Sequence, residues 1–141
     1  MGIDISACGK IIASAGGDTI KLWNLETNLA SHTLNGHART VWSIRFSPSN
    51  RLLVSASDDK TVKVWDAETG ERIKTLKGHL KGVFCSIFSP DNKLIGSGSA
   101  DKTIKIWNSD NGGLQSTLTG HTHAVVCLVC LLYTSPSPRD S

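Results

Sequence analysis

The amino-acid sequence predicts an all-β fold built from repeated units of four short antiparallel strands. One observation is the segment Leu52–Asp66, in which two runs rich in apolar and small residues flank a turn of Asp58, Asp59 and Lys60. The second run alternates β-branched residues with a lysine, and this period of two is typical of a strand. Similar segments occur at residues 12–23 and 95–107. A strand pair that recurs along the chain indicates a repeated sheet.

The spacing of these segments is constant. The recurring residues are Trp23, Trp65 and Trp107, which are 42 residues apart, and the glycines of three Gly-His pairs, Gly36, Gly78 and Gly120, which keep the same step. A period of about 40–45 residues with Gly-His and Trp-Asp pairs is the signature of a propeller blade with four strands. The chain therefore resembles the WD-repeat β-propeller family over roughly residues 5–130. The resemblance implies four-stranded antiparallel blades that form part of a propeller.

The repeat divides the chain into five segments. We expect an incomplete first unit at residues 1–35, complete units at residues 36–77 and 78–119, and the start of a fourth unit at residues 120–130. The first unit lacks a Gly-His pair, and its turn at residues 16–18 is one residue shorter than the later turns. Residues 131–141 match no part of the repeat and carry two prolines within three positions, so we interpret them as a non-native tail.

The strands follow from the same pattern, unit by unit. In the first unit we expect the second, third and fourth strands at residues 11–15, 19–23 and 28–34. The second unit should have strands at residues 41–46, 52–57, 61–66 and 72–76, and the third at 83–88, 94–99, 103–108 and 114–118. Propellers close with about 4–8 blades. Two complete units cannot close a ring, so this chain alone should expose sheet edges and apolar faces.

Each complete unit carries four polar or aromatic residues at fixed spacing. The sets are His37, Ser57, Asp59 and Trp65 in the second unit, and His79, Ser99, Asp101 and Trp107 in the third. In the proteins that the chain resembles, such residues form one hydrogen-bonded chain inside the blade. A buried indole, imidazole or carboxylate that stays unpaired costs about 1–3 kcal/mol. We expect the aspartate to accept hydrogen bonds from the histidine and from turn amides, and the serine to bridge histidine and tryptophan.

The first unit departs from this pattern. It retains Asp18 and Trp23, but it has Gly16 at the place of the serine and no histidine. We therefore expect a broken hydrogen-bond network in this unit and the lowest stability of the three.

The same residue types invite two chemical interpretations. A His, Ser and Asp set resembles a catalytic triad, but a nucleophile would be unique and would lie in a pocket, whereas this set occurs twice beside a tryptophan. We therefore assign no catalytic residue and expect no enzyme activity. His121, His123, Cys127 and Cys130 have metal-binding side chains, yet Cys127 matches Cys85 in the repeat and the two cysteines would point to opposite faces of one strand. We expect no metal and no cofactor.

Two aromatic residues indicate a binding surface. Trp42 and Phe84 each lie five residues after the histidine of their unit. In the resembled propellers this position lies on the top face, at the mouth of the central channel. Arg39, Thr40, Asp58 and Lys81 would lie on the same rim. Aromatic anchors with nearby charge are frequent in protein interfaces, so we predict that these six residues bind a partner. The alternative is that both rings only fill gaps between blades.

The resemblance implies a non-catalytic scaffold that docks peptide segments of other proteins on its top face to assemble a multiprotein complex. The remaining blades of the parent propeller would be further partners. The second and third units resemble WD-repeat adaptor subunits of histone methyltransferase complexes most closely, through residues 54–61, 74–79 and 83–85. In those adaptors the aromatic residue at the place of Phe84 helps to clamp an arginine of a bound peptide. The alternatives are a chromatin-associated adaptor and the frame of a larger enzyme whose active site lies elsewhere.

Composition narrows the classes of partner. The chain has 141 residues, of which 39% are hydrophobic and 19% charged, which favours a packed core over disorder. The net charge of +3 is small, and the sequence contains no run of basic residues, so we expect no direct contact with nucleic acid. The apolar run at residues 125–133 is too short to span a membrane. The four cysteines form no disulfide framework and no signal peptide is visible, which favours an intracellular location, in the cytoplasm or nucleus.

Overall fold

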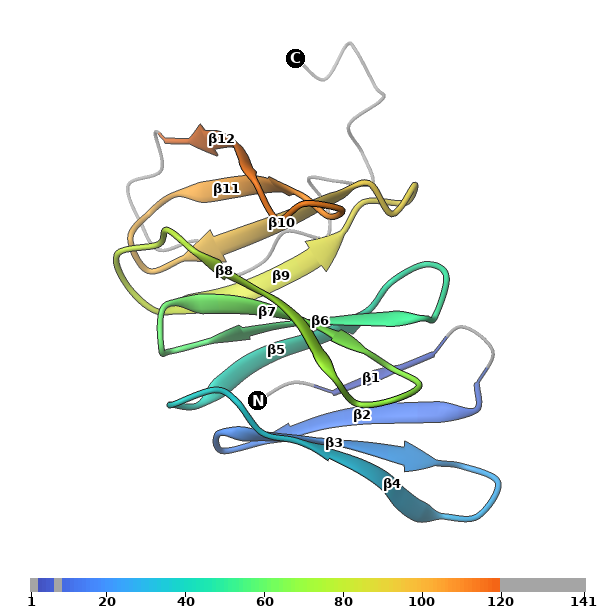
Figure 1. The fold of residues 1–141 in the computed structure, drawn as a ribbon. Helices are drawn as coiled ribbons and strands as arrows, with labels where there is room; N and C mark the ends of the chain where they lie inside the picture. Colours follow the sequence, from blue (N-terminus) through green and yellow to red (C-terminus); the bar gives the residue numbers. More distant parts are fainter. Residues whose placement is uncertain (1–2, 7–8, 120–141) are drawn as a thin grey trace, which may run out of the picture.

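The computed structural model describes residues 3–6 and 9–119, and in this part of the chain every regular element is a β-strand (Figure 1). The first sheet contains β1 (Ile3–Ile5), β2 (Ile11–Gly16), β3 (Thr19–Asn24) and β4 (Leu29–Leu34). The second contains β5 (Val41–Phe46), β6 (Leu52–Ser57), β7 (Thr61–Asp66) and β8 (Arg72–Lys77). The third contains β9 (Val83–Phe88), β10 (Leu94–Ser99), β11 (Ile104–Asn108) and β12 (Leu114–Leu118).

The bounds of β2 to β12 agree with the predicted strands to within one residue at each end, whereas β1 was not among the predicted strands. The strand β8, for example, continues to Lys77, and β11 begins at Ile104. The prediction of an all-β fold with four-stranded antiparallel units is confirmed. The predicted fourth unit at residues 120–130 and the predicted tail at residues 131–141 lie outside the described residues.

Each sheet is an antiparallel meander, in which consecutive strands are neighbours. The three sheets stack one on the next, with β1–β4 at the bottom of Figure 1 and β9–β12 at the top. Their first strands, β1, β5 and β9, are the inner strands, and β5 contacts both of the others. Their last strands are the outer edges, and β12 is exposed along its whole length. This is the arrangement of successive propeller blades.

The hydrophobic core lies between the sheets. The first sheet contributes small and aliphatic side chains to its interface with the second sheet, which contributes larger ones: Ala13, Ala15, Ile20, Leu22 and Leu34 pack with Val41, Ile44, Phe46, Leu53 and Trp65. The next interface repeats the pattern, with Val54, Ala56, Val62, Val64 and Leu76 against Val83, Phe88, Ile95 and Trp107. The second sheet is thus buried on both faces, which explains why β6 is apolar or small at every position.

The turn between β2 and β3 is shorter than its counterparts, as the sequence predicts. It contains two residues, Gly17 and Asp18, whereas residues 58–60 connect β6 to β7. Gly17 has a φ of +62°, a conformation that glycine adopts without steric cost. Its carbonyl oxygen accepts a hydrogen bond of 2.8 Å from the amide of Val41. The short turn therefore ties the first sheet to the first strand of the second.

Candidate functional site

A chain of hydrogen bonds runs through the second sheet. His37 Nδ1 lies 2.8 Å from Asp59 Oδ2, and His37 Nε2 lies 2.7 Å from Ser55 Oγ. The indole N–H of Trp65 donates to Ser55 Oγ over 2.9 Å. Asp59 also accepts from the amide of Ala38 and from both the amide and the hydroxyl of Thr61. The carboxylate thus joins the segment before β5 to the turn after β6.

The third sheet repeats this arrangement with nearly the same distances. His79 lies 2.9 Å from Asp101 and 2.7 Å from Ser97, and the indole of Trp107 donates to Ser97 over 2.9 Å. Both histidines are buried, and the serine hydroxyls are fully buried. The cost of leaving such groups unpaired makes these networks a strong constraint on the fold of each sheet.

The predicted serine was wrong in both units. Ser55 and Ser97 bridge histidine to tryptophan, and Ser57 and Ser99 do not. The pairing of Leu53 with Trp65 explains this, since Ser55 is the next residue on the same face, while Ser57 lies about 13 Å along the strand from Leu53. Ser57 instead donates to the carbonyl oxygens of residues 39 and 40 and accepts from the amide of Asp59. Ser99 makes the corresponding bonds to residues 81, 82 and 101.

The first sheet retains more of the network than the sequence predicted. The indole of Trp23 donates to Ser14 Oγ over 3.0 Å, so the bridging serine is present and the expectation of its loss was wrong. Gly16, taken as the place of the missing serine, lies at the end of β2 instead. Asp18 is exposed in the turn, and no histidine of the described residues pairs with it. In this part of the chain, the first sheet therefore has only the tryptophan–serine half of the network.

The glycine of each Gly-His pair also has a packing role. A Cβ atom at Gly36 would lie 3.0 Å from the Trp65 ring, and one at Gly78 would lie 3.1 Å from the Trp107 ring. The glycine lets the chain before the histidine cross the edge of the indole. The two residues of the Gly-His pair therefore have different roles. The glycine leaves room for the tryptophan ring, and the histidine forms a hydrogen bond with the bridging serine.

Polar chemistry fixes the direction of each bond. A carboxylate only accepts, so His37 Nδ1 carries a proton and donates to Asp59. In the neutral imidazole, Nε2 then accepts from the hydroxyl of Ser55, which in turn accepts from Trp65. Burial lowers the pKa of His37 below 6.5, and the hydrogen bond and charge of Asp59 oppose this only in part. Burial has the same effect on the pKa of His79.

The pKa values of the two aspartates are lowered for a different reason. Burial acts to raise the pKa of Asp59, but hydrogen bonds from Thr61, His37 and the amide of Ala38 outweigh it and lower the pKa from 3.8 to about 2. Burial likewise opposes a lowered pKa at Asp101, where Thr103, Leu80 and His79 donate. The networks are thus built for a neutral histidine and an ionised aspartate.

Acidification should therefore destabilise the protein in two stages. The pKa values of two histidines and two aspartates, His37, His79, Asp59 and Asp101, are lower in the folded state than in the unfolded chain. The unfolded chain therefore binds more protons, and the stability of the fold decreases as the pH is lowered. The loss from histidine begins below about pH 6.5, and that from aspartate follows as pH falls from about 4 toward 2. Urea unfolding at pH 7.5, 5.5 and 3.0 measures both. We expect a His37→Gln/His79→Gln variant to lose most of the dependence between pH 7.5 and 5.5, whereas His32→Gln should retain it.

The geometry of Asp59, His37 and Ser55 resembles that of a catalytic triad, but its surroundings do not suit a nucleophile. Ser55 is 0% exposed, and its oxygen already accepts the N–H of Trp65. A substrate could reach this hydroxyl only if the sheet opened. The arrangement therefore acts as an internal clasp. Within the described residues no group of three or more His, Cys, Asp or Glu side chains could hold a metal ion.

The residues predicted to bind a partner gather at one end of the second and third sheets. We call them the rim: Arg39, Thr40, Trp42, Asp58, Lys81 and Phe84. The rings of Trp42 and Phe84 meet edge to face, with centroids 6.0 Å apart, and so bridge the two sheets. Trp42 is 38% exposed and Phe84 is half-buried. The pair therefore fills the gap between the sheets and also presents an aromatic surface to solvent.

Charged and backbone groups frame this aromatic pair. Arg39 Nη1 lies 3.5 Å from Asp58 Oδ2; the Arg39 side chain is largely exposed and the Asp58 side chain is partly exposed. The amide of Asp58 donates to the carbonyl oxygen of Thr40 over 2.9 Å. A Cβ atom at Gly82 would lie 2.5 Å from Asp58 Oδ1, so the glycine admits the Asp58 side chain between the two sheets. An exposed ion pair of this length adds little stability, and its partners are free to exchange.

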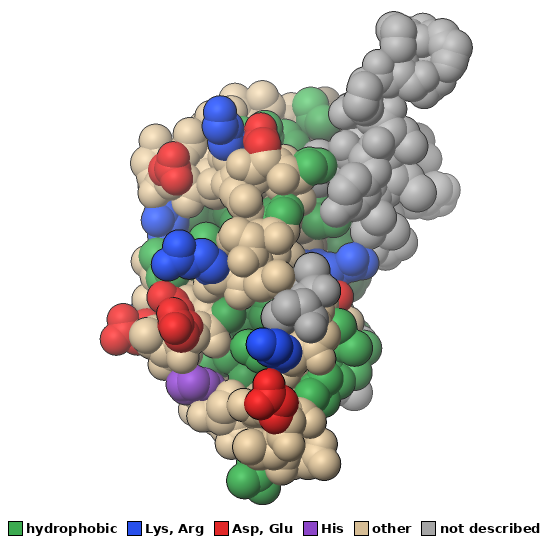
Figure 2. Space-filling view, turned by 90° about the vertical axis from the view of Figure 1, so that its right-hand side faces the viewer, with side chains coloured by type: hydrophobic (Ala, Val, Ile, Leu, Met, Phe, Trp, Pro, Cys, Tyr) green, Lys and Arg blue, Asp and Glu red, His purple; other side chains and the backbone are tan. Residues whose placement is uncertain are grey.

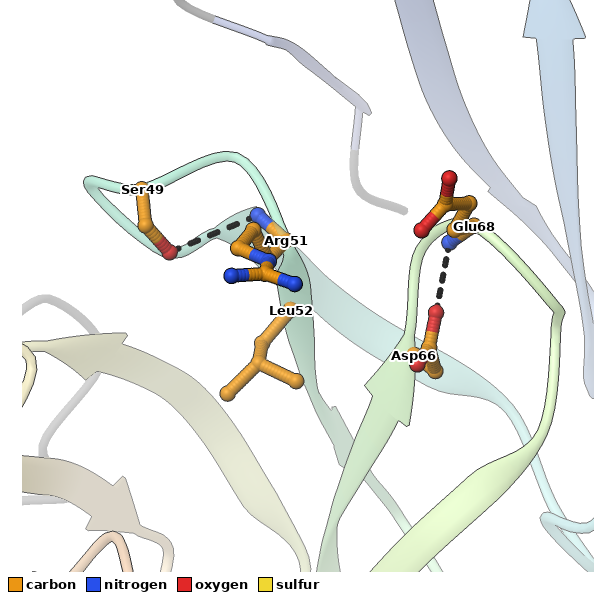
Figure 3. A pocket seen from close by; sticks show the side chains of 5 residues that line it. All are labelled: Ser49, Arg51, Leu52, Asp66 and Glu68. Carbon is orange, nitrogen blue, oxygen red and sulfur yellow. Dashed lines mark hydrogen bonds between the residues drawn. The ribbon is translucent and has the colours of Figure 1, made fainter.

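The opposite end of the second sheet carries a shallow pocket of about 300 Å³ lined by Ser49, Arg51, Leu52, Asp66 and Glu68 (Figure 3). Two hydrogen bonds there close local turns, from the amide of Arg51 to Ser49 and from the amide of Glu68 to Asp66. Figure 2 shows basic and acidic side chains interspersed on the face in view, with no continuous patch of one sign. Over the described residues, no helix is both long and apolar enough to span a membrane.

A comparison with known protein families tests the family membership that the repeat suggests. The family described as WD domain, G-beta repeat (WD40) matches residues 1–24, 29–66 and 70–108. The chain belongs to the WD-repeat family. WD-repeat folds serve as protein-interaction scaffolds and are typically non-catalytic, and the described sheets are blades of this type.

Individual WD-repeat proteins are similar to parts of the chain. WD repeat-containing protein SL1-17 of Schistosoma mansoni is 39% identical over 56 residues, which cover 39% of this chain and 19% of that protein. Protein hir-1 of Neurospora crassa is 37% identical over 67 residues, covering 39% of this chain and 6% of that protein.

Solved WD-repeat structures share the fold over most of the described residues. The structure of U3-55K has a TM-score of 0.84 at 26% identity and covers 88% of this chain and 40% of its own. The crystal structure of RRP9 WD40 repeats has the same TM-score and identity, covering 88% of this chain and 39% of its own. The chain thus spans about two fifths of the solved structures and at most about a fifth of the curated relatives it matches.

Proposed function

We propose that the rim docks extended peptide segments of other proteins, and that the chain contributes to a non-catalytic platform that holds a multiprotein complex together. The observation that carries this proposal is the pair of Trp42 and Phe84, which spans two sheets yet leaves Trp42 38% exposed. Large aromatic side chains on a fixed scaffold bind with little loss of conformational entropy, and they dominate the energetics of many interfaces.

The charged groups of the rim suit a peptide rather than a small molecule. Arg39 can bind a carboxylate or a backbone carbonyl, and Asp58 can accept hydrogen bonds from a cationic side chain or an amide. The two side chains are only loosely paired at 3.5 Å, so a partner can replace either one. The rim thus offers one apolar anchor point flanked by a donor and an acceptor.

A chromatin-associated adaptor in the nucleus is the second candidate. One observation favours it, since the exposed aromatic surface lies at the same rim as the Asp58 carboxylate. An aromatic face and a carboxylate together favour a cationic side chain such as arginine. A peptide that depends on arginine would support this candidate, and a peptide that binds without one would favour the more general platform.

The rim should lose affinity for peptides when its aromatic pair is removed. We expect Trp42→Ala and Phe84→Ala each to weaken the best-binding peptide from an immobilised peptide library by about tenfold or more. Ile73→Ala is the matched control, because Ile73 is 44% exposed on the outer strand β8, away from the rim. Fluorescence anisotropy with the full chain measures all three affinities.

A salt titration distinguishes peptide docking from nucleic-acid binding in the same assay. Peptide affinity should change modestly with salt, whereas a strong loss of affinity with rising salt would indicate charge-driven binding to phosphates. Equal affinity of the wild-type and Trp42→Ala chains for every peptide would contradict the proposed function.

A further inference from the structure

The outer strand of the second sheet, β8, differs in charge from the outer strands of the other two sheets (Figure 1). Three of its six residues are basic: Arg72, Lys74 and Lys77. The six residues of β4 and the five residues of β12 include no lysine or arginine. Lysines on an edge strand can serve only to prevent aggregation, but β4 and β12 are edge strands too and lack them. Edge protection alone therefore does not account for the charge of β8.

The register gathers positive charge on one side of this strand. Arg72 pairs with Trp65 and Thr75 pairs with Lys63, while Lys77 lies two residues beyond Thr75. Side chains of paired residues, and of residues two apart on a strand, point to the same side of a sheet. The ammonium group of Lys63 donates to the hydroxyl of Thr75 over 3.1 Å. We call Lys63, Arg72 and Lys77 the basic stripe.

The described residues supply little negative charge to the basic stripe. None of its three side chains forms an ion pair within residues 3–6 and 9–119. Burial lowers the pKa of Lys63 below 10.5, the charges of Arg72 and Lys77 lower it further, and the charge of Asp59 opposes them. That carboxylate is already bonded to His37. The stripe therefore concentrates positive charge for which this part of the chain has no free carboxylate.

The repeat shows which part of the stripe the fold itself requires. The buried lysine and its threonine recur in the third sheet as Lys105 and Thr117, whose Nζ and Oγ1 atoms are 3.0 Å apart. The places of the two exposed cations, 42 residues further on, are occupied by Leu114 and Thr119. Neither place is basic in the first sheet. A sheet of this type can thus be built without the exposed cations of β8.

We propose that β8 binds an extended acidic segment of a partner protein, which adds a strand to this edge of the second sheet and places its carboxylates along the basic stripe. An edge strand presents N–H and C=O groups with which such a segment can pair. Side chains on one side of a strand repeat every two residues, or about 6.8 Å, so acidic residues at alternate positions follow the stripe.

The three cations have different exposures, and this gives them different roles in the proposed contact. Arg72 and Lys77 are exposed and contact the carboxylates directly. Lys63 is 6% exposed and adds its charge from the neighbouring strand β7. This surface lies on the outer strand and the rim residues do not, so the proposal does not rest on the peptide binding proposed for the rim.

Two synthetic peptides test the proposal with the full chain. One alternates glutamate with threonine, and the other has glutamine in place of each glutamate. We expect fluorescence anisotropy to show that the acidic peptide binds more tightly by about tenfold or more. Arg72→Gln/Lys77→Gln should weaken its binding by about tenfold. Lys10→Gln/Lys93→Gln is the matched control, because it removes the same charge from exposed residues outside the strands, and it should leave the affinity unchanged.

Two N-methylated versions of the acidic peptide separate strand pairing from simple charge attraction. Each is methylated on one set of alternate amides, and only the set that faces β8 should weaken binding. Equal affinity of the acidic and glutamine peptides, equal losses in the two double variants, or no loss with either methylated peptide would overturn the proposal. A single-stranded oligonucleotide that binds more tightly than the acidic peptide, and that Arg72→Gln/Lys77→Gln releases, would also overturn it, because the stripe would then bind nucleic acid.

Discussion

Replacing Trp65 by alanine should lower the free energy of unfolding by about 3–5 kcal/mol. Trp65 is 1% exposed, packs in the core between the first and second sheets, and donates to Ser55. Its removal leaves a large cavity at the interface and deprives the buried hydroxyl of its donor. Because the same ring contacts two sheets, we expect the docking of the first sheet to weaken together with the second. Urea unfolding of the full chain, followed by circular dichroism, measures the change.

The control for this variant is another tryptophan of the same chain. Trp42 is 38% exposed and makes one ring contact, with Phe84. Trp42→Ala should therefore cost about 1 kcal/mol or less in stability. Equal losses for Trp65→Ala and Trp42→Ala would show that burial in the clasp does not distinguish the two residues.

Replacing Ser97 by alanine should cost about 2–4 kcal/mol, although only one oxygen atom is lost. That oxygen serves His79 and Trp107 at once, over 2.7 Å and 2.9 Å. Alanine leaves the indole N–H and the imidazole nitrogen buried without a partner, and an unmet buried group costs more than a made bond contributes. The side chain is fully buried, so water cannot substitute without disturbing the packing.

A neighbouring serine separates this effect from a general loss of hydroxyl groups. Ser99→Ala removes bonds to the carbonyl oxygens of Lys81 and Gly82, near the rim, and leaves the indole bond in place. The indole N–H resonance of Trp107 in a nitrogen-15 NMR spectrum should shift strongly in Ser97→Ala and little in Ser99→Ala. The reverse result would restore the assignment of the bridge to Ser99.

Repetition made the sheets predictable from the sequence. A strand pair that recurs with a fixed step fixes the class of fold, and turn residues between the strands fix their ends to within a residue. The bridging serines were missed for a geometric reason. Both Ser55 and Ser57 lie on the tryptophan side of β6, and only the register with Trp65 decides between them. One signal in the sequence could have identified the bridging serine. The pair Ser14 and Trp23 of the first unit recurs as Ser55 and Trp65 in the second.

The position of the rim aromatics along their strands was predictable from the sequence, but their contact with each other was not. The sequence spacing of Trp42 and Phe84 from their histidines placed both rings at one end of their strands. That the rings touch across two sheets depends on how the sheets stack, which residue spacing does not encode. The pairing of Arg39 with Asp58 depends on the turn between β6 and β7 in the same way.

Each described repeat forms a separate sheet whose tryptophan donates to a serine, and in the second and third sheets this tryptophan is buried. Hydrogen exchange of the four indole N–H groups, followed by NMR on the full chain, tests this directly. We predict slow exchange at Trp65 and Trp107, faster exchange at half-buried Trp23, and the fastest at exposed Trp42. Exchange at Trp65 and Trp107 that is as fast as at Trp42 would contradict the account.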